Sequence, residues 1–312
     1  MRRHLEALEV RHAGAGTVDA RRVALGQFMA WCEARELQRP GEITKPILER
    51  YQRHLFQVRK PNGQPLSLRS QCYRLNHVRQ WFRWLVRHNH LPMNPASDLD
   101  LPRIPRELLP EVLEAHEVEA VLAQPDVDDV QGLRDRAVLE LLYSTGVRRA
   151  EAAKLDVYDV EAVRGIVRVR QGKGRKDRVV PIGERALTWL QRYLDEARPQ
   201  LLADAQEPAL FLNRFGQRFH SPGLGQLTRR HLEAAGITKK GACHLFRHAM
   251  ATQMLENGAD VRYIQEMLGH ANLDTTQIYT HVSIGKLQAV HAATHPAAKL
   301  QRRERDASAE EA

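Results

Sequence analysis

The chain has 312 residues, of which 43% are apolar and 27% charged, a balance typical of soluble globular proteins. No uncharged apolar run reaches the length of a membrane span, and the N-terminus lacks the apolar stretch of a signal peptide, so we expect neither feature. The three cysteines lie far apart, so each is expected to be a reduced, packed side chain in a cytoplasmic protein.

The net charge of +9 is unevenly distributed along the chain. Residues 1–98 hold 17 Lys or Arg against 8 Asp or Glu, which leaves 30 of the 47 basic and 30 of the 38 acidic residues for the rest. Between Arg50 and Ala96 there are nine basic residues and no acidic one. Solvated helix faces usually mix both signs, so this segment favours a polyanionic partner, namely nucleic acid.

The N-terminal third is expected to form helices over residues 17–36, about 46–58 and 67–89. Thr17 and Ser67 can cap the first and third of these helices, and Pro46 suits the first turn of the second. In the third helix Arg79, Arg83 and Arg87 recur every four residues, so they share one face. Aligned guanidiniums repel one another, and a row of phosphates would relieve that repulsion, which predicts a nucleic-acid contact.

A proline-rich stretch follows and predicts a division of the chain into domains. Prolines at 92, 95, 102, 105 and 110 prevent any long helix there. We expect a basic helical domain at 1–98, a linker at 99–110, a second domain at 111–300 and a loose tail at 301–312; the resemblance described below implies that the first domain clamps DNA and that the second is catalytic.

The second domain is expected to be mainly helical with a small antiparallel sheet. The β-branched runs 165–170 and 178–182 flank a basic hairpin tip, in which Arg175 and Lys176 are candidate nucleic-acid contacts. Gly146 and Gly258 suit helix ends, and Asp260 suits a helix start. The helices are expected at about 115–123, 132–144, 151–154, 184–197, 222–235, 244–257, 260–268 and 274–281.

Several residues in this domain can bind a phosphate or move a proton. His244 and Arg247 lie three positions apart on one helix and so share a face. Arg148 supplies a second guanidinium, whose planar fork matches phosphate oxygens. His248 lies four residues after His244, as in a zinc pair, but the Glu of the zinc-protease motif and a third ligand are missing. We therefore expect chemistry at a phosphodiester without a metal.

Five segments, taken together, resemble the tyrosine recombinases, also called the phage integrase family, and most closely the Xer-type members. They are Thr145-Gly-Val-Arg148-Arg-Ala-Glu151, Gly172-Lys173-Gly-Arg-Lys, His244-Leu-Phe-Arg247-His248, Leu268-Gly-His270 and Thr276-Gln-Ile-Tyr279-Thr-His-Val. Their order and spacing match along the whole second domain. The resemblance implies a SAM-like helical bundle followed by a mixed, mainly α catalytic domain with a small antiparallel sheet.

The resemblance also implies how the reaction would proceed. Tyr279 would attack a DNA phosphate and leave a 3′-phosphotyrosyl bond and a free 5′-hydroxyl. Arg148 and Arg247 would clamp the non-bridging oxygens and stabilise the charge of the transition state. Because the phosphotyrosyl bond conserves energy, neither ATP nor any other cofactor would be needed.

The remaining roles follow from the same resemblance. Lys173 at the hairpin tip would protonate the leaving 5′-oxygen, although two neighbouring side chains there are equally basic. His244 would assist the nucleophile, and His270 would add a bond to the phosphate. Glu151 would orient neighbouring groups.

The resemblance implies double-stranded DNA as the partner. The protein would act as a homo-tetramer, or as a mixed tetramer with a related recombinase, on synapsed DNA, in the cytoplasm and associated with the nucleoid. Two alternatives stay open: a type IB topoisomerase that relaxes DNA without a specific site, and a DNA-binding regulator whose catalytic-looking residues are structural.

Overall fold

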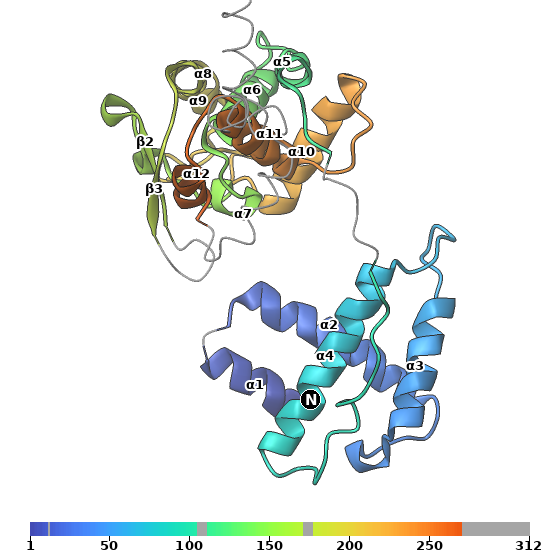
Figure 1. Ribbon diagram of the computed structural model, residues 1–312. Coiled ribbons are helices and arrows are strands. Elements are labelled where there is room, and N and C mark those ends of the chain that lie inside the picture. The colour runs from blue at the N-terminus through green and yellow to red at the C-terminus, as the bar shows by residue number, and fades with distance from the viewer. Residues whose placement is uncertain (12, 105–110, 171–176, 270–312) are drawn as a thin grey trace, which may run out of the picture. The chain divides into compact units, whose positions relative to one another are not determined.

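The computed structural model describes residues 1–312 except residue 12 and the segments 105–110, 171–176 and 270–312 (Figure 1). The chain divides into two compact units, Met1–Glu107 and Leu108–Ala312, which we call unit 1 and unit 2. Both are mainly helical, and unit 2 adds a small antiparallel sheet, so the predicted fold class is confirmed. None of the described helices is long and apolar enough to span a membrane.

Unit 1 is a bundle of four α-helices around an aromatic core. Helix α2 packs against both α1 and α4, and α3 packs against α4. In the core the ring of Phe28 lies edge-on to that of Tyr51, with centroids 4.8 Å apart, and Phe82 is fully buried beside them. The helices are α1 Arg2–Val10, α2 Ala15–Glu33, α3 Lys45–Gln57 and α4 Leu68–Arg87.

The predicted helix starts in unit 1 were partly right. Ser67 caps α4, since its hydroxyl accepts a hydrogen bond from the backbone N–H of Ser70 at 3.2 Å. The predicted cap at Thr17 was wrong, because α2 begins two residues earlier, with Gly14 at its N-cap. The backbone N–H of Thr17 itself donates to the Gly14 carbonyl, so Thr17 belongs to the first helical turn.

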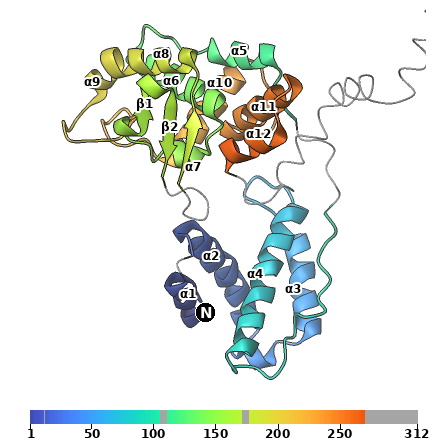
Figure 2. The same ribbon diagram turned by 60° about the vertical axis from the view of Figure 1, so that its left-hand side comes forward.

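Unit 2 is built around α6, which is buried along most of its length. Helices α8 and α11 both pack against α6, while α10 contacts α5, α7 and α11 (Figure 2). Helix α12 packs between α11 and strand β3. The helices are α5 Ala115–Leu122, α6 Val130–Thr145, α7 Arg149–Ala152, α8 Glu184–Arg192, α9 Arg198–Leu201, α10 Ser221–Ala234, α11 Cys243–Glu256 and α12 Val261–Leu268.

The sheet of unit 2 contains the predicted hairpin and one further strand. Strand β2 (Ile166–Val169) pairs antiparallel with β3 (Arg178–Pro181), and Val167 lies opposite Val180. Both of these valines are fully buried, so one face of the hairpin closes over the core. The short strand β1 (Val160–Glu161) pairs with the other edge of β2 and gives the order β1-β2-β3. The hairpin tip lies outside the described residues.

Candidate active site

Arg148 is positioned by a sharp turn between α6 and α7. Gly146 ends α6 with a φ of 58°, in the left-handed region that glycine adopts without strain. Arg148 then becomes the N-cap residue of α7, and its backbone N–H donates to Glu151 Oε2 at 2.8 Å. Its side chain bonds the same carboxylate, with Nη1 2.9 Å from Glu151 Oε1. The turn therefore fixes the arginine and its acceptor together.

The carboxylate of Glu151 also accepts two hydrogen bonds from Arg178, the first residue of β3. Arg178 Nη1 lies 3.0 Å from Oε1, and Nη2 lies 2.8 Å from Oε2, which is a bidentate pair. Burial alone would raise the pKa of Glu151, but the hydrogen bonds from Arg178 and Arg148 outweigh it and lower the pKa to about 2. Glu151 is therefore an anion at any physiological pH.

Arg247 reaches the same region from α11. Its side chain is buried, with the residue only 7% exposed, and it donates from Nη1 to the carbonyl of Gly146. Its Nη2 lies 2.8 Å from the carbonyl oxygen of Leu268. His244, one helical turn earlier on α11, is exposed. The helix thus presents a buried guanidinium and an accessible imidazole at neighbouring positions.

Three arginines from three segments converge on the C-terminal turn of α12. Arg178 Nε lies 2.9 Å from the carbonyl oxygen of Met267, and Arg247 bonds the next carbonyl. Arg148 Nη2 lies 3.2 Å from the carbonyl oxygen of Gly269. The last carbonyls of a helix lack partners within the helix and carry its partial negative charge, so cations suit them. The next residue in the chain is His270.

Glycine is required at the residue that ends this turn. Gly269 has a φ of 59°, and a Cβ atom there would lie only 3.0 Å from Cδ of Arg178. The Arg178 side chain therefore lies directly over the backbone of Gly269, and a larger residue would push it away.

His248 lies deeper in the domain than His244. Burial lowers its pKa to about 4, with smaller contributions from the nearby His244 and Arg247, so the ring is neutral at physiological pH. Within the described residues, no group of three His, Cys, Asp or Glu side chains has an arrangement that could hold a metal ion.

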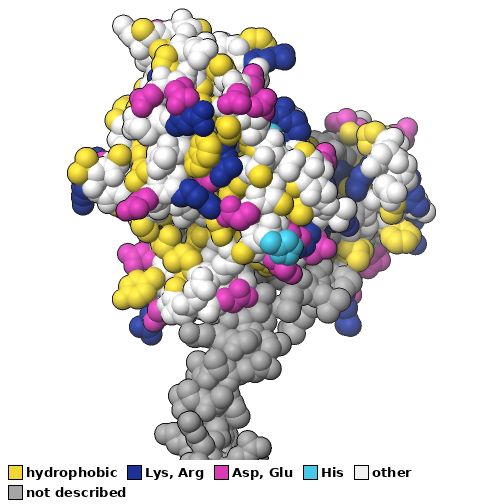
Figure 3. All heavy atoms as spheres, turned by 90° about the horizontal axis from the view of Figure 1, so that it is seen from above, with side chains coloured by type: hydrophobic (Ala, Val, Ile, Leu, Met, Phe, Trp, Pro, Cys, Tyr) yellow, Lys and Arg dark blue, Asp and Glu magenta, His cyan; other side chains and the backbone are white. Residues whose placement is uncertain are grey.

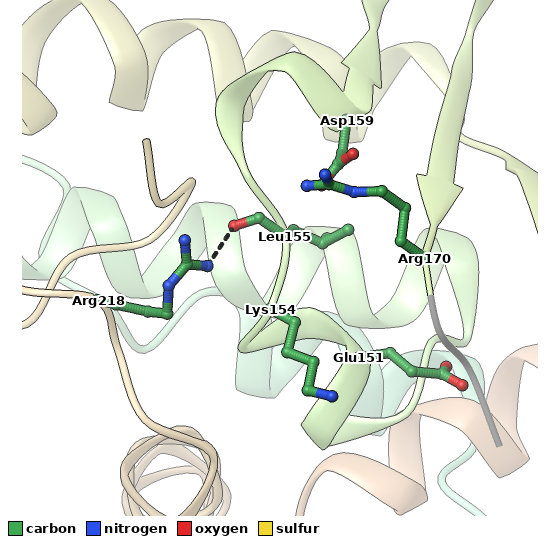
Figure 4. Close-up of a pocket in the computed structure, with 6 residues that line it drawn as sticks. All are labelled: Glu151, Lys154, Leu155, Asp159, Arg170 and Arg218. Atoms are coloured by element: carbon green, nitrogen blue, oxygen red, sulfur yellow. Dashed lines mark hydrogen bonds and ion pairs between the residues drawn. The ribbon is translucent and has the colours of Figure 1, made fainter. Parts of the chain in front are cut away.

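A pocket beside the site is bordered by the strand that leads into the hairpin tip. Arg170, just after β2, lies against Asp159 (Figure 4) and donates to its carboxylate at 2.7 Å. It also donates to the carboxylate of Asp156. Arg218 enters from the opposite side and also pairs with Asp156. These pairs fix the end of β2 where the chain turns toward the hairpin tip. The other lining residues are Glu151, Lys154 and Leu155.

The structure thus brings together three of the predicted site residues, Arg148, Glu151 and Arg247, with His244 one turn away on α11. The remaining predicted residues of unit 2 lie outside the described part of the chain: Lys173, Arg175, Lys176, His270 and Tyr279. Sequence reasoning missed Arg178. The only signal was its place after a basic hairpin tip, which does not separate it from the basic residues before it.

In unit 1 the predicted arginine row lies on α4. Arg83 and Arg87 are exposed, and Arg79 is half-buried. The exposed face of α4 also carries Asn76 and Gln80, side chains that can pair with base edges, which sequence reasoning did not single out.

Comparison with known proteins identifies the class of this chain. The model of the phage integrase family matches residues 111–285. Tyrosine recombinase XerC 2 of Ralstonia nicotianae is 56% identical over 302 residues, which cover 97% of this chain and 86% of that protein. Tyrosine recombinase XerD of Pseudomonas aeruginosa is 39% identical over 295 residues, which cover 94% and 96%.

Solved structures of recombinases are also similar to this chain. The crystal structure of XerA recombinase aligns with a TM-score of 0.52 and 29% identity, over 95% of this chain and 97% of that one. The fold is also shared with XerH recombinase bound to its palindromic difH substrate, with a TM-score of 0.70, 23% identity, and coverage of 90% and 81%. The chain therefore belongs to the phage integrase family. Within it, the chain is a site-specific tyrosine recombinase of the Xer type, and the topoisomerase and regulator alternatives are not favoured.

Proposed function

We propose that this recombinase cuts and rejoins double-stranded DNA through Tyr279, with Arg148 and Arg247 holding the scissile phosphate. The observation that carries this proposal is the convergence of the two guanidiniums on the turn that ends α12, directly before His270. Arginines fixed in this way need no rearrangement when negative charge develops on a phosphate, which is the main requirement for stabilising the transition state.

The proposed reaction is a pair of transesterifications. Tyr279 Oη forms a bond to phosphorus while the bond from phosphorus to the 5′-oxygen breaks, and the leaving oxygen takes a proton from Lys173. His244 takes the proton of the tyrosine or bonds its oxygen, and its exposure on α11 supports that role. His270 donates to a phosphate oxygen. In the second step a 5′-hydroxyl attacks the phosphotyrosine and restores the DNA strand.

Glu151 has a positioning role in this proposal. It accepts hydrogen bonds from the backbone and the side chain of Arg148, so it restricts the guanidinium to one orientation. The negative charge of Glu151 is fully shared between two arginines, which leaves the site as a whole positive and suited to a phosphate.

We further propose that unit 1 contacts DNA through the exposed face of α4, with Arg83 and Arg87 on phosphates and Asn76 and Gln80 at base edges. Arg175 and Lys176 would contact the DNA backbone near the scissile phosphate. The active assembly would be a tetramer, of this chain alone or with a related recombinase, on two DNA sites in the bacterial nucleoid.

The substitution Tyr279→Phe tests the covalent mechanism. The recombination site is first located by denaturing host DNA after incubation with the wild-type protein and sequencing the strand ends that carry protein. A duplex with that site and a nick next to it then traps the adduct. Tyr279→Phe should bind this duplex with unchanged affinity and form no adduct, because phenylalanine lacks the attacking oxygen. An adduct with Tyr279→Phe would refute the proposal.

A further inference from the structure

The further inference concerns Arg178, which none of the roles above includes. Its guanidinium donates to both oxygens of Glu151 and to the carbonyl of Met267. We infer that Arg178 is a positioning residue for strand cleavage, acting on Arg148 through Glu151 and on the turn that precedes His270. This inference deepens the proposed function and depends on it.

The contacts of Arg178 form a fork between two parts of the site. Its two terminal nitrogens bind the carboxylate of Glu151, and its Nε binds the end of α12. Glu151 in turn holds Arg148. Arg178 therefore sets the distance between the α6–α7 turn and the α12 turn, which are the two places from which the proposed phosphate ligands come.

Arg178 is less exposed than the arginine that it orients. Its side chain is 12% exposed, against 27% for that of Arg148. Three of its five N–H groups are engaged by these acceptors in the described part of the chain. A side chain buried and engaged in this way is suited to hold other groups in place, whereas Arg148 retains more surface for a ligand.

The position of Arg178 in the sheet adds a link to the hairpin. It is the first residue of β3 and lies opposite Val169, the last residue of β2. The hairpin segment that contains Lys173 leaves and re-enters the sheet between these two residues. Arg178 therefore connects the base of the hairpin to the two turns of the site.

Lysine cannot replace these contacts. An ammonium group on a flexible chain can approach the carboxylate of Glu151, but it cannot bind both oxygens side by side and also reach the Met267 carbonyl. The variant Arg178→Lys thus keeps the positive charge but loses the paired hydrogen bonds to Glu151 together with the bond to the Met267 carbonyl. Arg178→Gln removes both.

The test compares these two variants with the wild type and with Arg192→Gln as a control. Arg192 lies on α8 and pairs with Glu196 at 3.0 Å, outside the site. Each protein is measured for thermal unfolding, for affinity toward the nicked duplex with the mapped site, and for the single-turnover rate of adduct formation. We expect Arg178→Lys and Arg178→Gln to bind the duplex like the wild type and to form the adduct about tenfold to a hundredfold more slowly.

A double substitution separates positioning from general loss of structure. If Arg178 acts through Glu151, Glu151→Gln combined with Arg178→Gln should lose much less rate than the product of the two single losses. In the control double substitution, Arg192→Gln with Glu151→Gln, the loss of rate should equal the product of the two single losses.

The outcomes are decisive in each direction. Wild-type adduct rates in both Arg178 variants, or fully multiplicative losses in the double substitution, would overturn the inference. Variants that lose DNA affinity in proportion to rate would make Arg178 a DNA contact, and failure of even Arg178→Lys to fold would make it a purely structural residue; either result also overturns it. If the wild-type protein forms no adduct, the proposed function itself fails and the inference falls with it.

Discussion

At the scale of single residues, the site depends on one buried carboxylate between two guanidiniums. Glu151 is 6% exposed, and an unpaired anion at that depth would be costly. Arg148 binds this carboxylate from the same turn, and Arg178 binds it from β3. Arg247, from α11, donates to the carbonyl of Leu268. With these partners the folded protein stabilises the charged form of Glu151, so protonation must weaken the fold.

This arrangement predicts how acid affects the protein and the variant Glu151→Gln. The folded pKa of Glu151 is about 2, below its ordinary value of 4.5, so its contribution to stability is present above pH 4.5 and is lost as the pH falls toward 2. At neutral pH the contribution is at most about 3 kcal/mol. The difference in unfolding free energy between wild type and Glu151→Gln, measured in urea, should therefore shrink as the pH falls from about 5 to about 3.

The control for this prediction is Glu196→Gln. Glu196 pairs with Arg192 on the surface, and its side chain is 54% exposed, so the pair contributes little. The difference in unfolding free energy between the wild type and Glu196→Gln should therefore stay near zero at every pH. A constant difference for Glu151→Gln across the acid range would mean that the carboxyl keeps its ordinary pKa in the folded protein.

The sequence alone identifies Arg148, Glu151 and Arg247 as candidate site residues, because each lies in a short motif with a recognisable spacing. Arg178 could not be selected in this way. Its partners lie 27 and 89 positions away, on α7 and α12, and only the packing of β3 against α12 brings them together. No local pattern contains that information.

At the scale of elements, helix ends decide where the site residues fall. Helix α6 leads into the turn of Arg148, and its first N–H groups are bonded by Asp129, whose carboxylate accepts from the backbone of Gln131 at 2.9 Å and of Gly132 at 3.0 Å. A cap of this kind satisfies donors that have no partner within the helix.

Asp129→Ala should therefore lower the unfolding free energy by about 1 kcal/mol, measured by urea denaturation. The adjacent Asp128 provides a matched control. It is also exposed, and its carboxylate accepts no hydrogen bond in the described part of the chain. Asp128→Ala should change stability by less than about 0.5 kcal/mol. Equal losses in the two variants would show that loss of charge, rather than loss of the cap, is responsible.

The predicted helices agree with the structure where a capping residue or a terminal glycine coincides with an apolar periodicity. The caps at Ser67 and Asp260 and the glycine end at Gly146 are confirmed. Among the described elements that were not predicted are α1 and β1. Helix α1 has no side-chain cap and packs on α2, and β1 has only two residues and exists through pairing with β2. Both depend on tertiary contacts, which a local pattern cannot show.

At the scale of the whole molecule, the two units differ in charge. The excess of basic residues lies within residues 1–98, and the rest of the chain is balanced. On the face of the molecule in Figure 3, Lys or Arg and Asp or Glu side chains lie interspersed. In unit 2 many arginines pair with carboxylates, whereas α4 contains five arginines and no acidic residue. Electrostatic attraction to a polyanion should therefore come mainly from unit 1.

This division predicts which substitutions change the salt dependence of DNA binding. Each arginine that contacts a phosphate releases bound cations, so Arg83→Gln and Arg87→Gln should each reduce the slope of log affinity against log salt concentration by up to about one. Arg192→Gln should leave the slope unchanged, because Arg192 is already paired with Glu196. The measurement is a titration of a fluorescent duplex with the mapped site at several salt concentrations. Unchanged slopes for both α4 variants would mean that DNA does not lie along this helix, and the charge asymmetry would then need another partner.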